Sequence, residues 1–159
     1  LMLIMMGCDR AQGYGIAKPM PANNVLEWLS EYTPNEEWQA YGKKYRSHKE
    51  NKVKLFRIIT KHWNESFVHN IHSSPESIEH WPIMNAKHCP CGAWIQQAEQ
   101  EQLFEEGLES FKQAHEEVHL IANAILLKYQ EGDIEVSRSV LHDFRTAYDD
   151  MSNALGKCV

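Results

Sequence analysis

The strongest periodic signal in the chain is the stretch from Phe104 to Tyr129, FEEGLESFKQAHEEVHLIANAILLKY. Apolar side chains and one histidine recur along it at steps of three and four residues: Phe104, Leu108, Phe111, His115, Val118, Ala122, Ile125 and Tyr129. This spacing predicts one long amphipathic helix. Gly132 can end that helix, and Asp133 can cap the next.

The segments on either side repeat this pattern. A helix is predicted from about Lys52 to His72, with a buried face formed by Leu55, Ile59, His62, Ser66 and His69. A last helix is predicted through Val136, Val140, Phe144, Ala147, Met151 and Leu155. Between them, a helix that starts at Ser74-Pro75-Glu76 must be short, because Pro82 and Pro90 interrupt it. The pattern predicts an all-α fold, an antiparallel four-helix bundle over residues 52–159.

The N-terminal third has a different character. Glycine and proline in residues 12–22 predict a turn, a short strand and a stop, and Asn24 can cap a helix that follows. Residues 33–51 are polar and are predicted to form a linker with some helical content. We therefore expect three parts, residues 1–32, 33–51 and 52–159.

Composition excludes several classes of protein. The chain has 159 residues, 43% of them hydrophobic, and a net charge of −6, which argues against a surface built to bind nucleic acid. The apolar run at residues 1–6 is too short to cross a bilayer, and we expect no membrane segment in this chain. Four scattered cysteines favour free thiols or metal ligands in a reducing compartment, which indicates the cytoplasm.

Histidine and cysteine together suggest a metal site. His115 and His119 lie one helical turn apart and can share one ion, His62 is expected to face the same core, and Cys89 precedes residues that need burial. Three imidazoles and one thiolate would complete a tetrahedral zinc site. The alternative is that the histidines are hydrogen-bonded core residues and Cys89 is an inert thiol. The combination of four such residues on facing elements favours the metal site.

Residues 115–119 also match the HExxH pattern of zinc peptidases, with Glu116 as the base that activates water. We disfavour this hypothesis because Glu116 is expected to point away from the core and Cys89 would fill the open position that a peptidase needs. A di-iron bundle would require a second ExxH pair, which the helix around His62 does not offer. A redox dithiol at Cys89 and Cys91 has the wrong spacing.

Residues 7–22, GCDRAQGYGIAKPMPA, followed by Trp28 and Leu29, closely resemble the C-terminal end of EAL domains, the cyclic di-GMP phosphodiesterases built as an α/β barrel. The resemblance implies that residues 1–32 are a remnant, the last strand and helix, of such a barrel. It also implies that Gln12 corresponds to a substrate-binding residue. The upstream catalytic residues are absent from the sequence, so we expect no enzymatic activity from this chain.

Two motifs, Cys89-Pro90-Cys91-Gly92-Ala93-Trp94-Ile95 and His115-Glu-Glu-Val-His119, are similar to the CZB family, the chemoreceptor zinc-binding domains. The resemblance implies a four-helix bundle whose zinc ion is held by three histidines and one cysteine, as found on bacterial chemoreceptors and cyclic di-GMP enzymes. It assigns Cys89, His115 and His119 as ligands. His62 is favoured as the first ligand, and His69 is a second candidate.

These observations predict a zinc-binding regulatory module at the C-terminus of a bacterial cyclic di-GMP signalling protein. Its expected partners are the adjacent EAL domain and a second copy in a homodimer. The alternative function is a dimerisation or interaction bundle in which zinc is purely structural.

Overall fold

The computed structural model describes residues 2–6, 8, 10–43 and 47–158. The chain divides into two compact units, residues 1–52 and residues 53–159.

The described part of the first unit is helical and contains no strand. Its elements are α1 (Met2–Met5), the 3₁₀ turn η1 (Ala22–Asn24), α2 (Val25–Glu31) and α3 (Glu36–Lys43). The short strand predicted within residues 12–22 is therefore wrong. A turn occupies part of that segment, where Ile16 and Ala17 donate backbone hydrogen bonds to the Gly13 carbonyl. A strand needs a neighbouring strand to satisfy its backbone groups, and the described part of this unit offers none.

The helix predicted after Asn24 is present as α2, with Asn24 at its N-terminal boundary. Residues 33–51 contain α3 and the start of α4. The resemblance to EAL domains includes Gly7 and Asp9, which lie outside the described residues.

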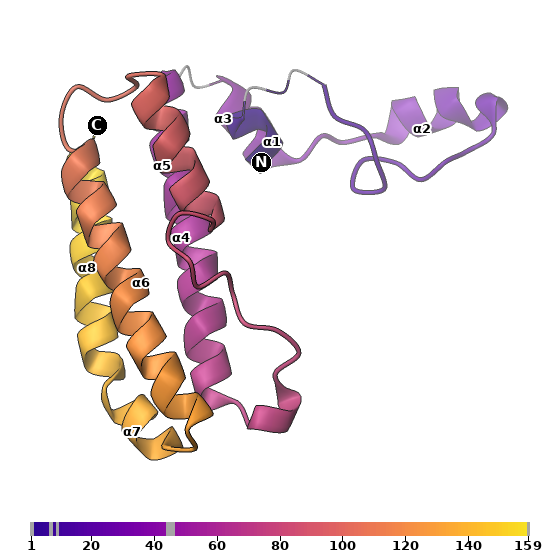
Figure 1. Cartoon of the computed structure of the whole chain (residues 1–159). Helices are drawn as coiled ribbons and strands as arrows, with labels where there is room; N and C mark the ends of the chain where they lie inside the picture. The colour runs from indigo at the N-terminus through magenta and orange to yellow at the C-terminus, as the bar shows by residue number, and fades with distance from the viewer. Residues whose placement is uncertain (1, 7, 9, 44–46, 159) are drawn as a thin grey trace. The chain divides into compact units, whose positions relative to one another are not determined.

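The second unit contains most of α4 (His48–His72), then η2 (Pro75–Ser77), α5 (Pro90–Gln100), α6 (Leu108–Gln130), α7 (Ile134–Ser139) and α8 (Leu141–Gly156). Figure 1 shows α4 and α6 running in one direction, and α5 and α8 running in the other. Residues 78–89 return beside α4 without regular structure before α5 begins. The described part of the unit is thus an all-helical bundle whose second member is half loop and half helix.

Large aromatic side chains fill the core of this unit. Phe56, Phe67, Phe111 and Phe144 are completely buried. The ring of Phe67 lies 4.9 Å from that of Phe144, and the ring of Phe56 lies 5.6 Å from that of Phe111. Through these contacts α4 packs against α6 and α8. Burying a phenylalanine side chain contributes on the order of 2 kcal/mol, so this cluster is a major source of the unit's stability.

The buried face of α4 differs from the predicted one. His62 and His69 are exposed, and the buried positions include Phe56, Thr60 and Phe67. The prediction that the two histidines face the core is therefore wrong. The sequence of α4 contains two possible apolar faces. The face with aromatic side chains is the buried one because its burial removes more apolar surface from water.

The predicted last helix is divided into α7 and α8, which meet at Val140. The break has a structural role at the end of α4. Arg138 on α7 donates hydrogen bonds of 3.2 Å to the carbonyl oxygens of Ile71 and His72. These carbonyls belong to the last turn of α4 and have no partner within their own helix. Arg138 therefore joins the end of α4 to the turn between α6 and α8.

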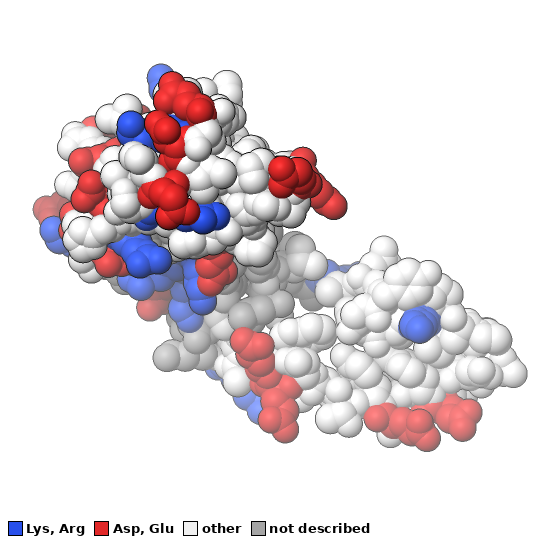
Figure 2. Space-filling model, turned by 90° about the horizontal axis from the view of Figure 1, so that it is seen from below, with Lys and Arg blue, Asp and Glu red and all other residues white. Residues whose placement is uncertain are grey.

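None of the helices that the structure describes combines the length and apolar character needed to cross a membrane. Acidic and basic side chains are interspersed on the face seen in Figure 2.

Candidate metal centre

Three potential metal ligands meet inside the second unit, residues 53–159, which we call the helical unit. Cys89, His115 and His119 are buried, and one ligand atom from each lies within 4.8 Å of the others. The Cys89 Sγ atom is 3.2 Å from Nε2 of His115. The His115 and His119 rings meet edge to face, with centroids 4.7 Å apart. Among the described residues this is the group of histidine, cysteine and acidic side chains that could hold a metal ion.

Helix α6 positions the two histidines. His115 and His119 are separated by one turn, so both project from the same face toward the bundle interior. Phe111, Val118 and Ala122 on the same helix are buried and fix that face against the core. The sequence period that predicted the helix thus also sets the direction of both imidazoles.

Cys89 is held by the start of α5. It is the N-cap residue of that helix, and its sulfur accepts a hydrogen bond of 3.2 Å from the Gly92 backbone N–H. Pro90 follows as the first helical residue, a position that proline favours. The preceding loop turns tightly, because the Asn85 carbonyl accepts from the Cys89 N–H at 3.0 Å. These contacts fix the backbone of Cys89 on both sides.

Gly92 allows this loop to close. A Cβ atom at this position would lie 1.8 Å from the carbonyl oxygen of Ala86, which is far inside van der Waals contact. Only a glycine lets α5 approach the loop so closely. The glycine of the Cys-x-x-Gly motif therefore has a steric role in placing the Cys89 sulfur.

A second group of contacts orients His119. Its Nδ1 atom lies 2.8 Å from the Met84 carbonyl oxygen, and this geometry assigns the ring proton to Nδ1. Nε2 then carries the lone pair that a metal requires. Asn123 donates to the same carbonyl at 3.1 Å and to the His119 carbonyl at 2.7 Å. The ring of Trp63 lies over His119 with centroids 4.5 Å apart. His119 is thus held by contacts from three segments.

Burial keeps the histidines neutral. It lowers the pKa of His115 to about 4, with a further contribution from the neighbouring His119. It also lowers the pKa of His119, against the opposing effect of the hydrogen bond to Met84. Neutral imidazole is the form that binds metal. The site therefore has its nitrogen ligands ready over a wide pH range.

Burial shifts the pKa of the Cys89 thiol upward, the opposite direction to the shift of the histidines. Burial raises the pKa of the Cys89 thiol, although backbone hydrogen bonds from Gly92 and Cys91 partly offset this effect. Burial also raises the pKa of Cys91 well above its usual range. Without metal, Cys89 is a protonated thiol at neutral pH. Metal binding would displace its proton.

The chemistry of these residues fits a transition metal. One thiol and two imidazoles are the ligands preferred by zinc. In a tetrahedral zinc site neighbouring S and N ligand atoms lie about 3.5 Å apart, as follows from metal–ligand bonds of about 2.0 to 2.3 Å. The observed 3.2 Å between Sγ and Nε2, and the 4.8 Å limit for the whole group, require only small side-chain rotations.

The structure does not bring His62 or His69 to this cluster. Both are exposed and line a separate surface hollow, together with His80 and Glu79. The residues of α4 that line the cavity beside the ligands are Ile59, Thr60 and Trp63. The exposed Gln12 belongs to the first unit.

Glu116 is exposed on α6 and lines two surface hollows, one with His115 and one with His119, but it does not line the cavity that the three ligands share. The carboxylate of the HExxH pattern thus lies outside the cavity in which the three ligands meet. This geometry disfavours the peptidase hypothesis.

Four other residues at the site were not predicted from the sequence: Met84, Asn123, Trp63 and Thr60. Trp63 had a detectable signal, since it recurs with Phe56, Thr60 and Phe67 at helical spacing. Met84 contributes only its backbone carbonyl, which no side-chain pattern reveals.

Comparison of the chain with family models, with curated proteins and with solved structures gave no match. The geometry of the three ligands is thus the main support for a function.

Proposed function

We propose that the helical unit is a zinc-binding regulatory module in which Cys89, His115 and His119 hold the ion. The observation that carries this proposal is the convergence of three buried ligand atoms within 4.8 Å. Core packing alone could explain one buried imidazole beside a buried thiol. It gives no reason for a second histidine one turn away on the same helix face. The oriented Nδ1 of His119 is a further feature typical of metal ligands.

Zinc would change the bundle at one defined place. Residues 84–89 have no regular structure before α5, and they contact α6 through Cys89 and the Met84 carbonyl. A zinc ion shared by Cys89 and the two histidines would tie this segment to α6. Trp63 lies over His119, so α4 contacts the same site. Zinc would therefore bias the packing of three segments at once, which is the requirement for a regulatory effect.

The wider context is proposed from the resemblances. Residues 7–22 support a place at the end of an EAL domain, and the Cys89 and His115 motifs support a CZB-like unit. Together they favour a bacterial cytoplasmic protein of cyclic di-GMP signalling in which the zinc module modulates the adjacent catalytic domain. The chain itself is proposed to have no catalytic activity.

Metal analysis tests the proposal. Wild-type protein purified with zinc, then desalted, should contain about one equivalent of zinc, whereas Cys89→Ala/His119→Ala should contain almost none. His62→Ala serves as the matched histidine control because His62 is exposed and outside the cluster. Cys8→Ser serves as the matched thiol control. Equal zinc content in the double variant and the wild type would refute the site.

A second function, an interaction bundle with structural zinc, is favoured by one observation. Leu120 and Leu127 are 71% and 59% exposed, and their spacing of seven residues places them on the same face of α6. Analytical ultracentrifugation with and without chelator separates the two functions. A dimer that persists unchanged after zinc removal would favour the interaction function.

A further inference from the structure

A second buried thiol lines the cavity in which the three ligands meet. Cys91 is buried and contributes to the wall of this cavity together with Cys89, His115 and His119. The cavity has room for about one water-sized particle, so a metal ion would fill it. An ion in this space would therefore have two thiols and two imidazoles around it.

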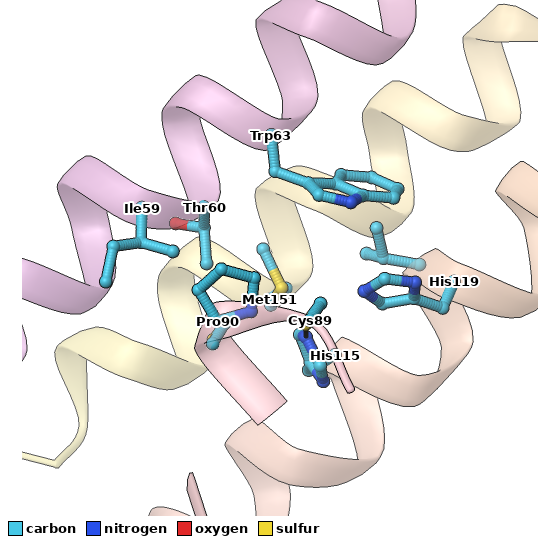
Figure 3. Close-up of a pocket in the computed structure, with 10 residues that line it drawn as sticks. Ile59, Thr60, Trp63, Cys89, Pro90, His115, His119 and Met151 are labelled. Carbon is cyan, nitrogen blue, oxygen red and sulfur yellow. Dashed lines mark hydrogen bonds between the residues drawn. The ribbon is translucent and has the colours of Figure 1, made fainter. Parts of the chain in front are cut away.

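The rest of the cavity wall offers no comparable zinc ligand. The Thr60 hydroxyl donates a hydrogen bond of 2.8 Å to the Phe56 carbonyl, and in Figure 3 its oxygen points away from the two histidines. The indole nitrogen of Trp63 is only a donor, and the thioether of Met151 is not one of the usual zinc ligands. The other lining side chains are apolar. Cys91 is thus the remaining lining residue of a type that zinc binds.

The start of α5 carries both thiols. Cys89 is the N-cap residue and Cys91 is the second residue of the helix. The backbone here is fixed, since the Cys89 sulfur accepts a hydrogen bond of 3.2 Å from the Gly92 N–H. The Cys91 sulfur lies outside the group of ligand atoms that are all within 4.8 Å of one another. Rotation to another staggered rotamer moves a cysteine sulfur by about 3 Å, so we expect Cys91 to approach the ion by side-chain rotation.

Charge balance favours a second thiolate. A zinc ion bound by one thiolate and two neutral imidazoles would leave a net positive charge in a buried and mainly apolar cavity. Burying a net charge is costly, whereas two thiolates neutralise the ion. Among the described residues, no carboxylate lines this cavity. Cys91 is therefore the side chain that can supply the second negative charge.

We infer that Cys91 is the fourth ligand, which makes the metal centre a closed tetrahedral site of two thiolates and two imidazoles. Zinc binding breaks the S–H bonds of Cys89 and Cys91, forms two zinc–sulfur bonds and releases two protons to solvent, with no change in oxidation state. This inference rests on the proposed metal site. It replaces the three-histidine set that the CZB resemblance implies, because His62 is exposed. A closed site suits a zinc ion that ties segments together rather than one that activates water.

X-ray absorption spectroscopy of the zinc-loaded full chain counts the sulfur neighbours directly. Zinc–sulfur bonds of about 2.3 Å are longer than zinc–nitrogen bonds of about 2.0 to 2.1 Å, so the two kinds of neighbour are distinguishable. The wild type, kept reduced and desalted, should show two sulfur and two nitrogen neighbours. One sulfur neighbour with three lighter ones would overturn the role of Cys91. This measurement needs no substitution and so does not depend on the folding of a variant.

Cobalt(II) allows a test by substitution, because it accepts the same N and S ligands as zinc and absorbs visible light. Cys91→Ser should keep about half of the wild-type sulfur-to-cobalt absorption, since one of two sulfur ligands is lost. Its zinc affinity should fall at least tenfold. Cys158→Ser is the matched control, because Cys158 is also a buried thiol but does not line the cavity. It should keep the wild-type absorption and affinity.

The outcomes separate the inference from the metal site on which it rests. Absence of sulfur-to-cobalt absorption in the wild type would refute the metal site and the inference together. Absorption that Cys89→Ser abolishes and Cys91→Ser leaves unchanged would keep the metal site and overturn the fourth ligand. Half of the absorption remaining in each single variant, and none in the double variant, is the result expected for two thiolate ligands.

Discussion

Acid should destabilise the metal-free helical unit through His115. Burial lowers the pKa of this imidazole to about 4 in the folded protein, whereas an unfolded chain has a histidine pKa of about 6.5. Between these two values the unfolded state binds a proton that the folded state does not. The free energy of unfolding therefore decreases as the pH falls from about 6.5 to about 4, and His115 causes no further loss below that range.

The size of the effect follows from the difference in pKa. A shift of about 2.5 pH units corresponds to roughly 3 kcal/mol at about 1.4 kcal/mol per unit. This is a substantial fraction of the stability of a small domain, about 5 to 15 kcal/mol. His119, whose pKa is also lowered by burial, acts in the same direction.

Urea unfolding in the presence of EDTA, followed by circular dichroism between pH 7.5 and 4, measures this loss. Over this interval the free energy of unfolding of His115→Gln should fall by roughly 3 kcal/mol less than that of the wild type. His62→Gln, an exposed position, should keep the wild-type dependence. Parallel curves for the wild type and His115→Gln would refute the argument. If His115→Gln does not fold, an NMR titration of the wild type decides, since a His115 that protonates near pH 6.5 gives the same refutation.

Four further substitutions test other parts of the structure. Gly92→Ala would place a Cβ atom 1.8 Å from the Ala86 carbonyl oxygen. The zinc affinity, measured by competition with a chelator, should therefore fall at least tenfold. Unchanged affinity would show that the loop before α5 has room to move. Phe144→Ala should lower the free energy of unfolding by about 3 to 5 kcal/mol in urea titrations, because the ring is completely buried. Leu127→Ala at an exposed position should cost less than about 1 kcal/mol, and equal losses in these two variants would contradict the assigned core. Asn123→Ala removes the two hydrogen bonds that Asn123 donates beside His119, to the Met84 and His119 carbonyls. Zinc affinity should therefore fall by about tenfold while the helix content stays the same. Wild-type zinc affinity in this variant would contradict a supporting role for Asn123.

The helical fold could be predicted because its main signals are local. The period of α6 directly fixed its buried face, and the pair at positions 115 and 119 followed from that period. The division between α7 and α8 could not be predicted in this way. It accompanies a long-range contact, in which Arg138 of α7 reaches the carbonyls at the end of α4, 66 and 67 residues earlier in the chain. Contacts between distant segments leave little trace in a local pattern.

The metal centre was predictable in part for the same reason. Cys89 and the two histidines carry their own chemical signal, and the structure brings them together. The hydrogen bond that His119 donates to Met84 ends on a backbone carbonyl, and the need for glycine at position 92 comes from the approach of Ala86. Neither contact could be derived from residue types alone.

The orientation of α4 decides whether this helix offers a histidine to the candidate metal centre. Two periodic faces overlap on this helix, and they differ by one residue, which is a rotation of about 100°. One face would bury His62 and supply a fourth ligand. The other buries Phe56 and Phe67 and turns Thr60 toward the site. The aromatic face wins because it removes the larger apolar area from water. The packing of the core thus turns His62 away from the candidate metal centre.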